Sequence, residues 1–239
     1  MISIIIPVFN AHEMTQECTG SVRDNTQDYE IVIVDNGSTP PIIGATIRNE
    51  SNLGFPVAVN QGIRAAKGEV IFLLNNDVIV TPGWASMILK HLEKADIVAP
   101  MSNYCAGMQR IVLPVYRNRA ELDTTAKEFM LKNPLLTHEV NWIIGFCMVF
   151  RKSLYDKLGP FDESLWPCSG EEIDFCLRSR AAGYKIGIAN NVYIHHHGSQ
   201  TFAEMQKDGC FDYDAIITRN NTHLSEKWGA DFFYRQDAN

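Results

Sequence analysis

Residues 69–100, "EVIFLLNNDVIVTPGWASMILKHLEKADIVAP", contain the pattern that decides the fold of this chain. The segment from Val70 to Leu74 is short and continuously apolar, as strands buried on both faces of a parallel sheet are. A helix-compatible stretch follows at 81–95, and a second apolar strand follows at 96–100. This alternation of strand, helix and strand predicts a βαβ unit of an α/β protein.

The same alternation extends back to the N-terminus. The apolar, β-branched runs "ISIIIPV" (2–8) and "YEIVIVD" (29–35) predict two further strands, and "ATIRN" (45–49) predicts a short one. Helices are predicted between the strands, at 11–26 and at 54–67. Together these elements predict a single Rossmann-like, mostly parallel sheet flanked by helices, with ligands bound beyond the carboxyl ends of the strands.

The second half of the chain has a less regular pattern. The elements predicted there are a strand leading into a helix at 145–153, strands at 184–189 and 192–197, and helices at 119–132, 170–182 and 213–228. No repeat, low-complexity tract or linker interrupts the sequence. We therefore expect one domain over 1–239.

The composition excludes several classes of protein. Hydrophobic residues make up 46% of the 239 residues and charged residues 21%, which is typical of a globular domain. The formal net charge of −7 argues against a general nucleic-acid binder, which neutralises phosphates with basic side chains. Six cysteines without a CxxC pair argue against a zinc knuckle or a disulfide framework and suit a reducing cytosol. No apolar stretch approaches the roughly 20 residues of a membrane span, so no transmembrane segment is predicted.

Polar side chains follow three of the predicted strands at the point where each strand ends. Asn10 follows the first strand, Asp35 and Asn36 follow the second, and Asn75 to Asp77 follow the fourth. Each site alone is explained by turns, which Asn and Asp commonly begin. Because the carboxyl ends of parallel strands share one edge, three such sites in register favour a common ligand-binding crevice.

The usual nucleotide-binding loops are missing from the sequence. No GxGxxG follows the first strand, and no GxxxxGK(S/T) occurs. The dinucleotide-binding and P-loop interpretations therefore lose their main support. A diphosphate bound without such loops needs a cation, and Asp77 offers the hard oxygen ligand that Mg²⁺ or Mn²⁺ prefers beside phosphates and water.

Five stretches in order resemble family-2 nucleotide-sugar glycosyltransferases of the GT-A fold, with similarity to a rhamnosyltransferase-like subgroup. They are "IIIPVFN" (4–10), "IVIVDNGS" (31–38), "NLGFPVAVNQGIRAAKGEVIFLLNND" (52–77), "GEEIDFCLRSRAAGY" (170–184) and "EKWG" (226–229). The resemblance implies inverting transfer of a sugar from a nucleoside-diphosphate donor, assisted by Mn²⁺ or Mg²⁺. It also implies a donor-binding half at 1–100 and an acceptor-binding half at 101–239.

The resemblance extends to individual donor-binding residues. Those that match are Pro7, Phe9, Asn10, Asp35, Asn52, Gly54, Asn60, Asn75 and Asn76. Asp35 matches the acid that contacts the pyrimidine base or its ribose, which favours a UDP- or dTDP-sugar. The stretch "NND" stands where the family has its DxD motif, so Asn75 replaces the first acid and one ligand charge is lost. Asn76 is then expected to face the donor and Asp77 the metal.

The triplet from His195 to His197 lies at the end of a predicted strand. Side chains alternate along a strand, so one of the three histidines must point away from the other two. The resemblance favours His196 as a second metal contact and leaves His195 and His197 open. The alternative is a hydrogen-bonded strand-end histidine without a metal, and adjacent strand residues argue against a dedicated zinc site.

Glu172 is the candidate catalytic base, because the resemblance places the base at the second acid of the "GEEID" stretch. An inverting transfer needs a carboxylate to accept the proton of the attacking hydroxyl. Most relatives in the family carry the shorter Asp at this position, so Glu171 remains an alternative. Two structural explanations compete: Ser169 and Glu172 fit an S-x-x-E capping box, and Asp174 and Arg178 fit a helical ion pair.

The acceptor side of the site is less well defined by the sequence. Trp142, Gly145 and Trp166 are its candidates by resemblance, although core packing explains an apolar Trp equally well. Lys227 could reach a phosphate or remain solvated. We expect a saccharide or glycan acceptor and a cytoplasmic protein, and leave open a contact with a membrane through that acceptor. The oligomeric state is not predicted.

Two other functions compete with sugar transfer. A nucleotide-sugar pyrophosphorylase has a similar sheet but begins with a Gly-rich loop that carries Arg or Lys, and this chain has none. A non-catalytic sugar-nucleotide-binding protein of the same fold would keep the donor pocket without transfer. Donor turnover in the presence of Mn²⁺ separates that protein from a transferase.

Overall fold

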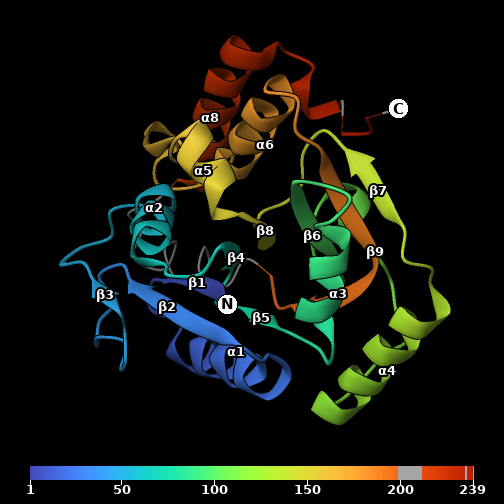
Figure 1. Ribbon diagram of the computed structural model, residues 1–239. Helices are drawn as coiled ribbons and strands as arrows, with labels where there is room; N and C mark the ends of the chain where they lie inside the picture. Colours follow the sequence, from blue (N-terminus) through green and yellow to red (C-terminus); the bar gives the residue numbers. More distant parts are fainter. Residues whose placement is uncertain (199–211, 235, 239) are drawn as a thin grey trace.

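The computed structural model describes residues 1–198, 212–234 and 236–238, so the sixth cysteine, Cys210, lies outside the described residues. Its strands are β1 (Ile2–Val8), β2 (Tyr29–Asp35), β3 (Ile47–Arg48), β4 (Val70–Leu74), β5 (Val78–Ile79), β6 (Ile97–Ser102), β7 (Thr137–Val140), β8 (Cys147–Arg151) and β9 (Ile186–His196). They form a sheet in the order β3-β2-β1-β4-β8-β6-β9-β5, and β7 also pairs with β9 (Figure 1).

Its helices are α1 (His12–Asn25), α2 (Phe55–Ala65), α3 (Trp84–His91), α4 (Arg119–Lys132), α5 (Lys152–Leu158), α6 (Glu171–Ala181) and α8 (Tyr213–Trp228). The bounds of α4 and α8 are those predicted. Asn118 caps the start of α4 and Asp212 caps the start of α8, each through a side-chain oxygen that accepts a backbone N–H. Such caps are local signals, which is why the sequence located these ends.

The sheet is parallel through β3, β2, β1 and β4, as the βαβ pattern predicts. In the second half of the chain β8 runs antiparallel between β4 and β6, and β6 pairs in parallel with β9. The strands predicted at 184–189 and 192–197 are one long strand, β9, whose register with β6 shifts between Pro100 and Met101. The short strands β5 and β7 were not predicted.

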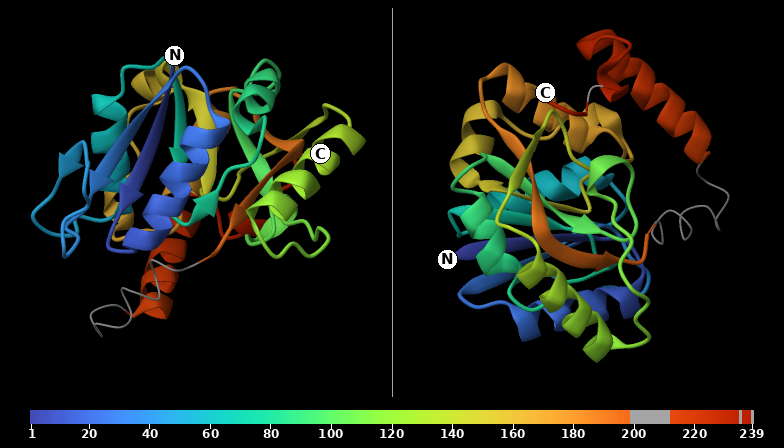
Figure 2. Two further views of the ribbon diagram at one scale, coloured as in Figure 1. Left: turned by 90° about the horizontal axis from the view of Figure 1, so that it is seen from below. Right: turned by 90° about the vertical axis from the view of Figure 1, so that its right-hand side faces the viewer.

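Helices cover both faces of the sheet, as expected for an α/β fold (Figures 1 and 2). Along β4, Ile71 and Leu73 pack in the core beneath α2, α5 and α6, whereas Phe72 and Leu74 pack beneath α1 and α3. A third, smaller core joins α4 to β9 around Tyr193. Apolar burial on both faces explains why these strands are continuously apolar in sequence.

The ligand-binding edge follows from the strand directions. Strands β1, β2, β4, β6 and β9 all finish at the same edge, and the antiparallel β8 begins there. The last residues of β1 and β2 lie level, since Val8 pairs with Asp35. The polar residues after these strands therefore collect at one place. In the described part of the chain, no helix has the length and apolarity needed to cross a bilayer.

Candidate active site

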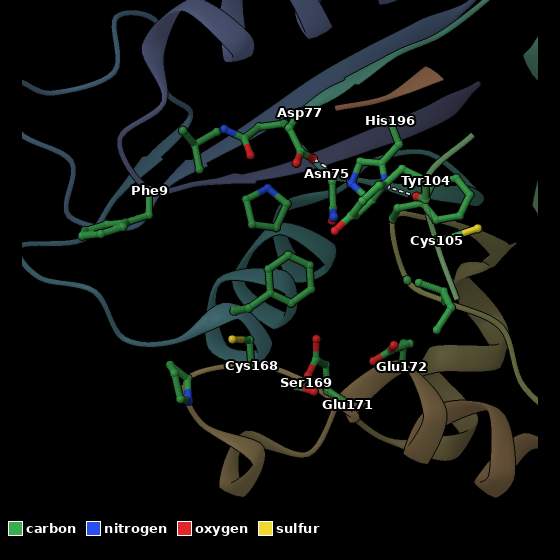
Figure 3. A pocket seen from close by; sticks show the side chains of 18 of the residues that line it. Phe9, Asn75, Asp77, Tyr104, Cys105, Cys168, Ser169, Glu171, Glu172 and His196 are labelled. Carbon is green, nitrogen blue, oxygen red and sulfur yellow. Dashed lines mark hydrogen bonds and ion pairs between the residues drawn. The ribbon is translucent and has the colours of Figure 1, made fainter. Parts of the chain in front are cut away.

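A cavity of about 530 Å³ opens at this edge, within the size range of small-molecule sites. Its walls come from the ends of the strands and from the segment that begins α6 (Figure 3). The lining residues are Pro7, Val8, Phe9, Asn36, Asn52, Phe55, Asn75, Asn76, Asp77, Tyr104, Cys105, Ala106, Arg110, Ile144, Gly145, Phe146, Pro167, Cys168, Ser169, Glu171, Glu172, His196 and Tyr213. The structure thus brings together candidates from both halves of the chain.

Asp77 and His196 form a buried pair in one wall of the cavity. Asp77 Oδ1 lies 3.2 Å from His196 Nε2, and Oδ1 makes no hydrogen bond to any described residue. The other ring nitrogen, His196 Nδ1, lies 2.7 Å from the carbonyl oxygen of Tyr104. A carbonyl only accepts, so Nδ1 carries the proton, and in the neutral ring Nε2 is then an acceptor.

Two acceptor atoms, a carboxylate oxygen and an imidazole nitrogen, therefore face each other when the imidazole is neutral. Such a pair is stabilised by a proton on the imidazole or by a cation that both atoms can bind. A carboxylate and an imidazole both suit a divalent metal ion, and the buried, unpartnered Oδ1 fits such a ligand. Among the described residues, no group of three or more His, Cys, Asp or Glu side chains could hold a metal. Phosphate oxygens and water would have to complete the coordination.

The backbone around this pair is held by hydrogen bonds between distant segments. His197 N–H donates to the Asp77 carbonyl oxygen at 2.9 Å, which joins the end of β9 to the turn after β4. Asn103 accepts from His196 N–H at 2.9 Å and donates to its carbonyl at 3.0 Å. The Phe146 ring stacks on the imidazole, with centroids 5.2 Å apart. The positions of both side chains are thus set by the fold.

The three histidines alternate as predicted. His196 lines the cavity, whereas His195 Nδ1 lies 2.5 Å from the Tyr116 hydroxyl and His197 Nε2 lies 3.0 Å from a Glu17 carboxylate oxygen. Burial, with the nearby His197 charge, lowers the pKa of His195 to about 4, so this ring is neutral at pH 7. His195 and His197 do not line the cavity in this structure.

Asn75 and Asn76 also reach the cavity. Asn75 N–H donates to the Phe146 carbonyl at 2.9 Å, and its side chain points into the cavity (Figure 3). Asn76 is buried, and its amide donates to Thr15 Oγ1 at 3.0 Å. The "NND" turn is therefore fixed to α1 and to the start of β8.

Glu171 and Glu172 lie across the cavity from the Asp77–His196 pair (Figure 3). Burial raises the pKa of Glu171 well above its usual value, and the Glu172 charge raises it further. Glu171 Oε2 is buried without a hydrogen-bond partner among the described residues. Burial also raises the pKa of Glu172, partly offset by backbone N–H groups that include that of Gly145. Such raised values are typical of catalytic carboxyl groups.

The capping box, the structural alternative for Glu172, is absent from α6. The N-cap of α6 is Gly170, with φ of 98°, and no side chain caps the helix. Glu172 is therefore the second helical residue and not the third, and Ser169 has φ of 82°. The box requires its Ser to be the N-cap, so the one-residue offset removes it. Glu172 extends toward the cavity instead.

The remaining side chains of α6 have structural contacts. The predicted ion pair is present, with Arg178 Nε 2.8 Å from Asp174 Oδ2. Asp174 Oδ1 also accepts from Trp228 Nε1 at 2.9 Å and lies 2.8 Å from Lys227 Nζ. Lys227 is thereby paired with a carboxylate and does not line the cavity.

Gly145 lines the cavity directly beside Glu172. A Cβ at this glycine would lie 3.1 Å from both Cβ and Cγ of Glu172, which is closer than ordinary contact. Glycine at position 145 therefore leaves the room that the side chain of Glu172, the candidate base, occupies.

The structure does not place Asp35 in the cavity. Its carboxylate is fully buried, accepts from Ser38 N–H at 2.8 Å and Ile42 N–H at 2.9 Å, and pairs with Arg48. Burial raises its pKa, but the hydrogen bonds from these groups outweigh burial and hold the pKa below its usual value. In this structure the carboxylate holds the loop after β2, and its expected contact with the donor base stays a prediction.

Asn36, which the sequence analysis did not assign to the donor, lines the cavity instead. Its amide donates to Asn52 Oδ1 at 2.9 Å and to the Gly54 carbonyl at 3.1 Å. Gly54 is the N-cap of α2, with φ of 92°, and does not line the cavity. Asn10 lies outside the lining too, where its Oδ1 accepts from Thr39 N–H at 3.0 Å. Pro7, Phe9 and Asn52 line it as expected.

Three further candidates lie outside the cavity lining. Asn60 is fully buried and donates to the Phe161 carbonyl and to Glu163, so its amide joins α2 to the segment before α6. Trp142 is buried in the core, where its Nε1 donates to the Phe232 carbonyl at 3.3 Å. Trp166 is 41% exposed and does not line the cavity, although the next residue, Pro167, does.

Several lining residues had no signal in the sequence. They are Tyr104, Cys105, Ala106, Arg110, Cys168 and Tyr213. All come from loops or helix ends in the second half of the chain, where no periodicity or motif marks a residue as facing a ligand.

Comparison with known proteins identifies the family of this chain. The family model described as "Glycosyl transferase family 2" matches residues 3–159. The glycosyltransferase AglE of Haloferax volcanii is 25% identical over 86% of this chain and 69% of its own length. A protein of Haemophilus influenzae described as an uncharacterized glycosyltransferase is 27% identical over 97% of this chain and 76% of its own length. The chain spans 27% of a similar protein from Sinorhizobium fredii.

A solved structure has the same fold. The crystal structure of GalNAc-T7 with UDP, GalNAc and Mn²⁺ superposes with a TM-score of 0.64 at 17% identity, over 82% of this chain and 43% of that one. This likeness agrees with the expected GT-A fold. Because the family model covers more than half of the sequence, and the sheet and cavity agree with it, the chain belongs to glycosyl transferase family 2.

Proposed function

We propose that this family-2 glycosyltransferase moves a sugar from a UDP- or dTDP-sugar to a hydroxyl group of a saccharide, with inversion at the anomeric carbon. The observation that carries the proposal is the opposition of two pairs across one cavity. Asp77 and His196 form one wall, and Glu171 and Glu172 form the other (Figure 3). An inverting displacement needs this arrangement, with the leaving group held on one side and a base on the other.

Asp77 and His196 are proposed to hold Mn²⁺ or Mg²⁺ together with the donor diphosphate. The unpartnered Asp77 Oδ1, 3.2 Å from Nε2 of the imidazole, supports this role. A bound divalent cation would neutralise charge on the departing diphosphate as a Lewis acid. The GalNAc-T7 structure, which contains UDP and Mn²⁺, supports the same use here.

Glu172 is proposed to accept the proton of the attacking hydroxyl. Two adjacent carboxyl groups in a buried site do not both ionise readily, so their pKa values separate. Burial raises the pKa of both carboxyl groups, and the charge of Glu172 raises that of Glu171 further, so we assign the proton of the pair to Glu171 and the role of base to Glu172. Glu172 is also the more exposed of the two, so an acceptor hydroxyl can approach its carboxylate.

The donor nucleotide is proposed to lie against the wall formed by Phe9, Asn36 and Asn52. The Asn36 amide ties this wall together through its bonds to Asn52 and Gly54. Phe9 provides an aromatic face of the kind on which a pyrimidine can stack.

A donor screen tests the proposal. UDP, dTDP, GDP and their common sugar conjugates are added to the protein with Mg²⁺, with Mn²⁺ or with EDTA, and the melting temperature is recorded. We expect the uridine or thymidine compounds to raise the melting temperature, and to do so more strongly with the cation. Donor hydrolysis followed by NMR should release the free sugar first in the anomeric configuration opposite to that of the donor. No shift and no hydrolysis with any nucleotide sugar would overturn the proposal, whereas a shift without turnover would indicate a binding protein.

A further inference from the structure

Arg110 is a cation in the cavity wall that the proposed mechanism does not use. Its side chain is exposed, and no carboxylate of the described residues lies within 4 Å of its guanidinium in an ion pair. Among the described lining residues it is the one Lys or Arg. By contrast, Arg48, Arg178 and Arg180 each pair with a carboxylate elsewhere in the fold.

The backbone that carries Arg110 is held on both sides. The preceding Gln109 is fully buried, accepts from Ile144 N–H at 2.6 Å, and donates to the Pro100 carbonyl at 3.3 Å. The following Ile111 donates its N–H to the Ser102 carbonyl at 2.9 Å. The backbone at Arg110 is thus fixed, and among the described residues no carboxylate pairs with its guanidinium.

Arg110 is connected through Gln109 and Ile144 to the segment that packs against the candidate base. Gln109 is bonded to Ile144, the next residue is Gly145, and Gly145 packs against Glu172. The charge of Arg110 acts on Cys105 as well, where it partly offsets the burial that raises the thiol pKa to about 12. Arg110 is therefore linked through the backbone to the proposed acceptor site.

We propose that Arg110 binds an anionic group, a carboxylate or a phosphate, that the acceptor carries close to its reacting hydroxyl. This inference rests on the proposed function for the division between donor and acceptor. The other charged side chains of the cavity wall, apart from His196, are the acids Asp77, Glu171 and Glu172. An anion in this cavity is repelled by ionised acids, so a free guanidinium, which binds carboxylate or phosphate in two parallel hydrogen bonds, defines where it binds.

Binding of simple probes tests the inference without turnover. Methyl β-D-glucuronide is compared with methyl β-D-glucoside, and glycerol 3-phosphate with glycerol, by NMR titration of the protein saturated with UDP and Mg²⁺. We expect one anionic probe to bind at least about tenfold more tightly than its neutral partner, since a charge-assisted hydrogen bond contributes that much. The pair that shows the preference identifies the group as a carboxylate or a phosphate.

Substitutions then assign the preference to Arg110. Arg110→Gln should abolish it, and Arg110→Lys should keep part of it, because an ammonium lacks the bidentate geometry. Arg151→Gln is the matched control, since Arg151 is an exposed arginine at the far end of β8, at the opposite edge of the sheet from the cavity. This control should bind all four probes like the wild type.

Three results would overturn the inference. The first is a wild-type protein that prefers neither anionic probe, and the second is a preference that survives in Arg110→Gln. The third is a loss of UDP affinity in Arg110→Gln as large as the loss of anion affinity, which would assign the guanidinium to the donor diphosphate. A wild-type protein that fails to bind UDP would instead count against the proposed function, and the probe titrations repeated without UDP would still report on Arg110.

Discussion

Asp77 Oδ1 and His196 Nε2 lie 3.2 Å apart, although one residue follows the fourth strand of the chain and the other ends the ninth. The contact joins two acceptors when the imidazole is neutral, because its Nδ1 proton is committed to the Tyr104 carbonyl. The fold therefore brings together a carboxylate oxygen and an imidazole nitrogen, two ligand types that divalent cations bind.

Asp77→Asn should remove most of the response to metal. An amide cannot supply the charge that a hard divalent cation prefers, so we expect the melting-temperature shift with Mn²⁺ and UDP to be largely lost. Without metal the variant should be no less stable, since Asn removes a buried negative charge whose Oδ1 accepts no hydrogen bond from the described residues. Asp123→Asn, a partly exposed residue of α4, is the control. An unaltered Mn²⁺ response in Asp77→Asn would remove Asp77 from the metal site.

Glu172→Gln should retain donor binding and lose transfer by about 10²-fold or more, the usual contribution of a general base. Because no side chain caps α6, the substitution has no cap to disturb, and the melting temperature should stay close to that of the wild type. Glu226→Gln on the exposed face of α8 controls for the change of charge. If Glu171→Gln abolishes transfer and Glu172→Gln does not, the base is Glu171.

Gly145→Ala tests the packing of the candidate base. The added methyl group would lie 3.1 Å from Glu172 Cβ and Cγ, so the glutamate must shift away from its position. We expect a lower turnover number with little change in the Michaelis constant for the donor. Gly20→Ala in α1 is a matched control, because its new Cβ meets nothing within 4 Å. That control should be more stable by about 0.5–1 kcal/mol, as alanine is in a helix. Equal turnover in both variants would contradict the prediction.

Glu171 should make stability depend on pH. Its folded pKa is raised above the unfolded value of about 4.3, so the folded state holds the proton more tightly. The resulting stabilisation is fully present below about pH 4.3 and is lost as pH rises through the folded pKa. Glu171→Gln should remove this dependence, so the free energy of unfolding of the wild type relative to the variant should fall as pH rises. Parallel curves from urea unfolding across pH would refute this assignment.

Asp35→Ala should destabilise the protein and not weaken donor binding selectively. The substitution leaves the buried N–H groups of Ser38 and Ile42 without an acceptor, at a cost of about 1–3 kcal/mol each. Since the folded pKa of Asp35 is lowered, its contribution is present above about pH 3.9 and is lost as pH falls through the folded value. Asp156→Ala, at an exposed ion pair, should cost less than about 1 kcal/mol. If Asp35→Ala kept full stability and lost much of its UDP affinity, Asp35 would instead contact the pyrimidine base of the donor.

The polar residues at the strand ends could be located from the sequence, because the apolar runs and the order of the elements were sufficient to predict the sheet. Continuous apolar runs marked the strands, and the βαβ order placed their carboxyl ends at one edge. Asn75, Asn76 and Asp77 therefore lie in the cavity wall as predicted. The same reasoning could not separate Asp35 from Asn36, because adjacent residues past a strand end differ only in the direction that the turn gives each side chain.

Some candidates lie outside the cavity lining because the same residue types also serve the core of the protein. Trp and Asn are residue types that often bind ligands. In this chain Trp142 packs in the core, and the amide of Asn60 donates to the Phe161 carbonyl and so joins two segments. The capping box is absent because Gly170 adopts a positive φ and moves the start of α6 by one residue. No pattern in the neighbouring residues predicted the contacts of Trp142 and Asn60 or the exact start of α6.

The sequence by itself determined the α/β class, the edge of the sheet that binds ligands, and the residue types that collect there. The apolar periodicity, the order of the predicted strands and the polar residues that follow them are visible in the sequence, so they can be recognised without knowledge of the fold. Only the tertiary structure decided that His196, and neither adjacent histidine, meets Asp77, and that Arg110 borders the same cavity. Those choices depend on contacts between segments far apart in the chain, such as the bonds of Asn103 to His196 and of Gln109 to Ile144. Burial and hydrogen bonding across the assembled sheet fix these side chains, and no local pattern encodes that assembly.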